Sequence, residues 1–86
     1  MSKKPTPTQI AKARYDEARH ILEAWTHRLA VAQANVYNTN KHGGDILAAR
    51  RNLNAVEIHR EDAKADEAIA RQQWVTTANK EIRAAA

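Results

Sequence analysis

The sequence predicts an all-α fold: an antiparallel two-helix hairpin with coiled-coil-like packing, which we expect to dimerise into a four-helix bundle. Three observations support this prediction. Residues that break helices occur in only two places, apolar residues recur at heptad spacing in both halves, and the alanine-rich composition lacks phenylalanine. With 86 residues, the chain has room for one small domain and a thin core.

The first helix is predicted over residues 7–38. Thr6 and Gln9 have the spacing of a capping box, in which each side chain accepts a hydrogen bond from the backbone N–H of the other residue. Pro7 then occupies the first helical position, where its missing N–H costs nothing. We expect residues 1–6 to form a flexible, basic N-terminal tail.

A turn is predicted over residues 39–45, followed by a second helix over about residues 46–83. Gly43 and Gly44 tolerate the positive φ angles that turns require. Asp45 is a good N-cap, because its carboxylate accepts from free backbone N–H groups and favours the positive end of the helix.

The two helices are expected to pack along one apolar seam each. In the first helix the seam residues alternate at spacings of four and three: Ala11, Tyr15, Ala18, Leu22, Trp25, Leu29, Ala32 and Val36. In the second helix the matching positions are Ile46, Ala49, Leu53, Val56, Arg60, Ala63, Glu67, Ala70 and Trp74. Folding at the glycine pair brings the seams together in antiparallel register, with most large side chains facing small ones.

Two charged seam residues interrupt this pattern. Arg60 is expected to face Trp25, with its guanidinium on the indole ring, and Glu67 to face Ala18. Both can snorkel out of a partly open seam, or they can form a polar layer that selects partner or register. Beyond Trp74 we expect the seam to shift by one residue and to continue through Val75, Ala78 and Ile82.

Both helices also carry apolar residues outside the seam, which are candidate oligomer rows. They are Ile10, Ile21 and Val31 in the first helix, and Leu47, Ile58 and Ile69 in the second. Soluble monomers usually avoid exposing such rows. We therefore expect self-association, most simply as a two-fold homodimer, and the alternative is a protein partner that covers the same rows.

The charges suggest contacts of two kinds. The chain has 14 basic and 10 acidic residues, for a net charge of +4. Five acids within residues 57–67 are expected to pair across the hairpin with Arg19, Arg28, His20 and His27.

The hairpin tip carries a second candidate surface, formed by Tyr37, Lys41, His42, Arg50 and Arg51. Basic side chains can contact phosphates and a tyrosine can stack on a base, so the tip is a candidate nucleic-acid contact. A solvated turn and a protein-docking tip are the alternatives.

Enzymatic chemistry finds little support in the sequence. Cysteine is absent, Ser2 is the one serine, and the glycine pair lacks a phosphate-binding fingerprint. The paired carboxylates Glu61 and Asp62 lie on a helix that offers no water-excluding cleft. The histidines lack the spacing of a metal site. We expect no catalytic, cofactor-binding or metal-binding residues.

The function that the sequence favours is a non-enzymatic interaction module: an oligomerising helical hairpin that acts as a small adaptor, assembly or inhibitor protein. The alternative is a small basic nucleic-acid-binding regulator that uses the hairpin tip. No apolar run approaches the ~18 residues of a membrane span, and the first residues do not resemble a secretory signal. We therefore expect a cytoplasmic protein with no membrane partner.

Overall fold

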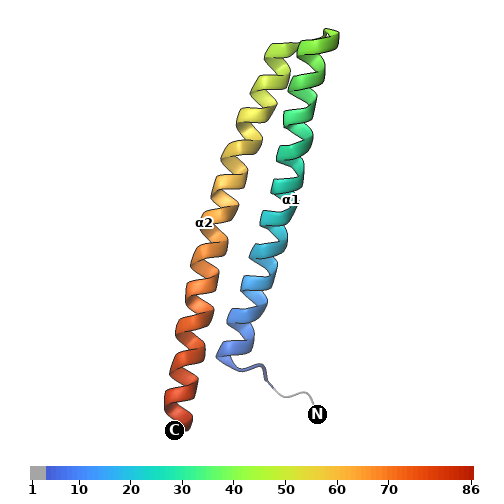
Figure 1. The fold of residues 1–86 in the computed structure, drawn as a ribbon. Helices are drawn as coiled ribbons and strands as arrows, with labels where there is room; N and C mark the ends of the chain where they lie inside the picture. Colours follow the sequence, from blue (N-terminus) through green and yellow to red (C-terminus); the bar gives the residue numbers. More distant parts are fainter. Residues whose placement is uncertain (1–3) are drawn as a thin grey trace.

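The hairpin predicted from the sequence is confirmed. The computed structural model describes residues 4–86, which form two long antiparallel helices, α1 (Pro7–His42) and α2 (Ile46–Ala85), and no strand. The helices lie side by side from the turn to the start of α1, and the end of α2 extends beyond that point (Figure 1). The start of α1 and the end of α2 are both at the end opposite the turn. The Cα atoms extend over 64 × 27 × 13 Å, so the hairpin is a flat rod.

The N-terminus of α1 is closed by the expected capping box. The Thr6 hydroxyl accepts from the Gln9 N–H at 3.1 Å, and the Gln9 side-chain oxygen accepts from the Thr6 N–H at 2.9 Å. Both bonds satisfy donors that the first helical turn leaves free. Of the tail predicted over residues 1–6, residues 1–3 lie outside the described part of the chain.

The turn is shorter than expected. Helix α1 continues to His42, four residues beyond the predicted end, and the connection consists of Gly43, Gly44 and Asp45. The glycines take positive φ angles of 89° and 128°, and the Gly43 N–H donates to the Thr39 carbonyl at 2.9 Å. The Asp45 carboxylate accepts from the Ala48 N–H at 3.0 Å and starts α2. Two glycines thus reverse the chain, and the residues before them keep their helical hydrogen bonds.

The core follows the predicted seam, and it is thin. The buried residues of the described chain are all small: Ala11, Ala32, Ala49, Val56, Ala63 and Ala70. Larger seam side chains such as Leu22, Leu29 and Leu53 are only half-buried. A two-helix hairpin has one interface, so a large side chain on it keeps one edge in water.

Near the free end of the hairpin, the rings of Tyr15 and Trp74 stack with centroids 5.3 Å apart. Helical side chains lean toward the N-terminus of their own helix. In an antiparallel pair, rings from adjacent layers therefore lean toward each other. The stack agrees with the predicted register, in which these residues occupy neighbouring layers.

The predicted shift of the seam beyond Trp74 is wrong. Val75 and Ile82 are 47% and 68% exposed, whereas Thr77 and Glu81 are half-buried and continue the original spacing. Ala78, the third residue of the shifted seam, is also half-buried. Supercoiling maintains the 3.5-residue period, so the seam passes through polar residues. Glu81 is held there because its carboxylate accepts from the Thr8 backbone N–H at 3.1 Å.

Candidate interaction surfaces

Because the hairpin is flat, it has two broad sides, and helical geometry assigns residues to them. In α1, Lys12 and Arg19 directly follow seam alanines, whereas Arg14 and Arg28 directly precede Tyr15 and Leu29. At about 100° per residue, these two sets lie on opposite flanks of the helix. We call the flank of Lys12 and Arg19 the charge-paired side and the flank of Arg14 and Arg28 the pocket side.

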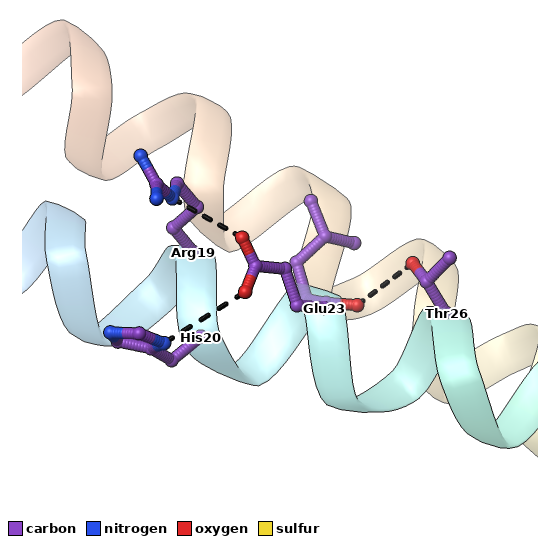
Figure 2. Close-up of polar contacts among 5 residues, drawn as sticks. Arg19, His20, Glu23 and Thr26 are labelled. Atoms are coloured by element: carbon purple, nitrogen blue, oxygen red, sulfur yellow. Dashed lines mark hydrogen bonds and ion pairs between the residues drawn. The ribbon is translucent and has the colours of Figure 1, made fainter.

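On the charge-paired side, the charges of α1 are neutralised within the helix. Lys12 pairs with Asp16 at 3.4 Å, and the guanidinium of Arg19 lies 3.3 Å from the Glu23 carboxylate. Figure 2 shows His20 reaching the same carboxylate, at 3.9 Å.

The expected cross-helix ion pairs do not form. Within residues 4–86 every ion pair joins residues of one helix, because exposed side chains find partners one turn away or at the next position. Arg28 and His27, which were expected to pair with the acids of α2, have no such pair.

The pocket side holds two open hollows between the helices. The hollow near the free end, of about 340 Å³, is lined by Pro7, Ile10, Ala11, Arg14, Gln73 and Thr77. The hollow nearer the turn, of about 230 Å³, is lined by Arg28, Val31, Ala32, Asn52 and Val56. Each combines apolar side chains and one arginine of α1 with a polar amide of α2.

A ring cluster borders the second hollow and corrects the prediction for Arg60. The Trp25 indole stacks on the His59 imidazole, with centroids 4.5 Å apart and planes 16° apart, and the Arg28 guanidinium lies 4.6 Å from the same ring. Arg60 instead pairs with Glu61 at 3.2 Å, and its Nε is buried without a hydrogen-bond partner. The imidazole that covers the Trp25 indole belongs to His59, which directly precedes the seam residue Arg60.

The six residues of the candidate oligomer rows are all exposed, but they do not share one surface. Ile10 and Val31 line the two hollows. Leu47, Ile58 and Ile69 recur every eleven residues, close to three helical turns, and form a strip on the outer surface of α2. Ile21, 46% exposed, lies between the hollows on α1.

The predicted tip residues are exposed around the turn. Tyr37 is 64% exposed, and the Lys41 ammonium lies 5.8 Å from the centroid of its ring. His42 ends α1, and Arg50 and Arg51 lie in the second turn of α2. In the described part of the chain, none of these basic side chains forms an ion pair.

The hollows and the Trp25 cluster were not anticipated from the sequence. A signal for them exists: Pro7, Arg14, Ile21 and Arg28 recur every seven residues, each directly before a seam position. A row at this spacing lies beside the seam and borders any hollow along it.

Other kinds of site are not found in residues 4–86. No group of three or more His, Asp or Glu side chains could hold a metal ion. Neither helix contains a stretch long and apolar enough to cross a membrane. Comparisons of the chain with protein-family models, with curated proteins and with solved structures find no match.

Proposed function

We propose that the chain is a non-enzymatic interaction module, an oligomerising helical hairpin that serves as a small adaptor, assembly or inhibitor protein. One observation carries the proposal: in the described residues only alanine and valine are buried, whereas the six aliphatic side chains of the candidate rows are 41–63% exposed. A further helix packed on these rows would bury them. The simplest source of such a helix is a second copy of the chain, in the cytoplasm.

The energetics favour association. Ordering the chain costs about 1.5 kcal/mol per residue, and a core of small side chains contributes little against that cost. Full burial of one isoleucine, leucine or valine side chain contributes roughly 1.5–3 kcal/mol. Covering even half of the exposed rows would therefore add several kcal/mol to the stability of each hairpin.

Sedimentation equilibrium and thermal melting, each over a hundredfold range of protein concentration, test this proposal. We expect a dimer or larger assembly, and a melting temperature that rises with concentration, because association stabilises the folded state by mass action. A monomer whose melting temperature is independent of concentration would contradict the proposal of self-association.

The exposed tip favours a second candidate function, a small nucleic-acid-binding regulator. In the described residues Lys41, Arg50 and Arg51 form no ion pair, and the Lys41 ammonium lies 5.8 Å from the centroid of the exposed Tyr37 ring. Fluorescence anisotropy with mixed DNA and RNA oligonucleotides should then show binding that weakens steeply with salt. The double variant Arg50→Gln/Arg51→Gln should lose it with unchanged helicity. Absence of binding at about 50 mM salt excludes this candidate.

A further inference from the structure

The pocket side of α1 has a mainly basic edge, with two arginines and one acid, Glu17, which belongs to the seven-residue row of Ile10 and Val31. Arg14 lines one hollow and Arg28 the other, and Ile21 lies midway between them in the same row. Neither arginine has an ion-pair partner in residues 4–86, in contrast to Lys12 and Arg19 on the other side.

The pocket side of α2 has an acidic edge. Asn52, His59, Asp66 and Gln73 recur every seven residues and therefore form one row. Asn52 and Gln73 line the two hollows and His59 stacks on Trp25, which places the whole row on the pocket side. Asp66 belongs to this row, and Asp62 lies one turn before it. Neither aspartate forms an ion pair in the described residues.

The basic and acidic edges lie at the same height along the rod. The first hollow joins Arg14 to Gln73, and the second joins Arg28 to Asn52. Because α2 runs antiparallel to α1, the segment from Asp62 to Asp66 lies between the heights of these two arginines. Measured along the rod axis, Asp66 is then about five residues, or ~8 Å, from the height of Arg14, and Asp62 is equally far from the height of Arg28.

We propose that the pocket side is the self-complementary surface of a two-fold dimer. An axis parallel to the helices places α1 of each protomer on α2 of the other. Arg14 then lies within side-chain reach of the partner's Asp66, and Arg28 within reach of the partner's Asp62. The proposal rests on the proposed function, since it specifies the surface and the partner for the self-association argued above.

The arginines and aspartates favour this arrangement over the other two-fold arrangement of the same surface, although Glu17 then lies near the height of the partner's Asp66. An axis perpendicular to the helices would place α1 on α1, with Arg14 near the partner's Arg28 and the aspartates near one another. Such like-charge contacts are unfavourable. The parallel axis also covers Ile10, Ile21 and Val31. A side about 64 Å long that spans two adjacent helices has room for the ~800 Å² per partner that a standard interface buries.

A charge-swap experiment tests the proposal by sedimentation equilibrium and native mass spectrometry. One variant carries Arg14→Glu and Arg28→Glu, and the other carries Asp62→Lys and Asp66→Lys. All four positions are exposed, so circular dichroism should show unchanged helicity. Each variant alone should dissociate at least tenfold more readily than the parent chain. The equimolar mixture should form a 1:1 heterodimer. In it, each contact between α1 of one protomer and α2 of the other again joins opposite charges.

The matched control is Lys12→Glu/Arg19→Glu, which changes the net charge equally on the charge-paired side and should associate like the parent. If each charge-swap variant by itself associates like the parent, or if the equimolar mixture forms no heterodimer, the assigned surface is wrong. Self-association itself would still stand. A parent chain that is monomeric throughout would instead overturn the proposed function, and the dimer with it.

Discussion

The two sides of the hairpin use the same residue types in different ways. On the charge-paired side, Lys12 and Arg19 of α1 each have an acid one turn away in the same helix. On the pocket side, Arg14 and Arg28 lie beside open apolar hollows and form no ion pair within residues 4–86. Local pairing is typical of a surface exposed to water, whereas unpaired charge beside exposed apolar area is typical of a surface that binds a partner.

Replacing Leu29 with aspartate should have the largest effect, because it removes the seam on which both sides depend. Leu29 is half-buried near the middle of α1, and a carboxylate there would be partly desolvated without a partner. We expect a loss of about 3 kcal/mol or more, seen as lost helicity and a collapsed thermal transition by circular dichroism. The neighbouring exposed change Ala30→Asp should leave most of the helicity intact. A Leu29→Asp protein that melts like the parent would show that the seam is misassigned.

Removing the Trp25 ring should have the next largest effect, because the ring belongs to the seam and borders the pocket side. The ring contacts both His59 and Arg28, so Trp25→Ala should cost about 2–3 kcal/mol of unfolding free energy in urea denaturation. Trp25→Phe keeps an aromatic face and should recover about half of the loss. An unchanged midpoint in Trp25→Ala would mean that the cluster contributes nothing to stability.

Breaking the ion pairs of the charge-paired side should have the smallest effect. Glu23→Gln removes the acid shared by Arg19 and His20, yet all three side chains are exposed (Figure 2). The expected change in unfolding free energy is about 0.5 kcal/mol or less, with unaltered oligomeric state. A shift larger than 1 kcal/mol, or dissociation of the assembly, would remove the distinction between the two sides.

The parts of the fold that depend on local chemistry were predictable from the sequence. The capping box of Thr6 and Gln9 and the cap of Asp45 depend on residues three positions apart, and the seam follows from heptad spacing. The helix end was placed too early because the polar residues before His42 have turn-like composition, although the two glycines are sufficient for the reversal.

Features that depend on competition between neighbouring side chains were not predictable in the same way. His59 and Arg60 are adjacent, and only packing decides which of them lies on Trp25. Val75 and Ile82 look like seam residues by composition. The hydrogen bond from Thr8 to Glu81 shows that the original seam continues past them.

The most direct test is the solvent accessibility of Trp25 in the assembled protein, measured as iodide quenching of its fluorescence in a Trp74→Phe background. We expect iodide to quench the Trp25 ring in dilute protein, and the ring to become strongly protected as concentration drives association, because the pocket side is then covered. An assembly in which Trp25 stays as accessible to iodide as in the dilute protein would contradict the assignment of the pocket side as the contact surface.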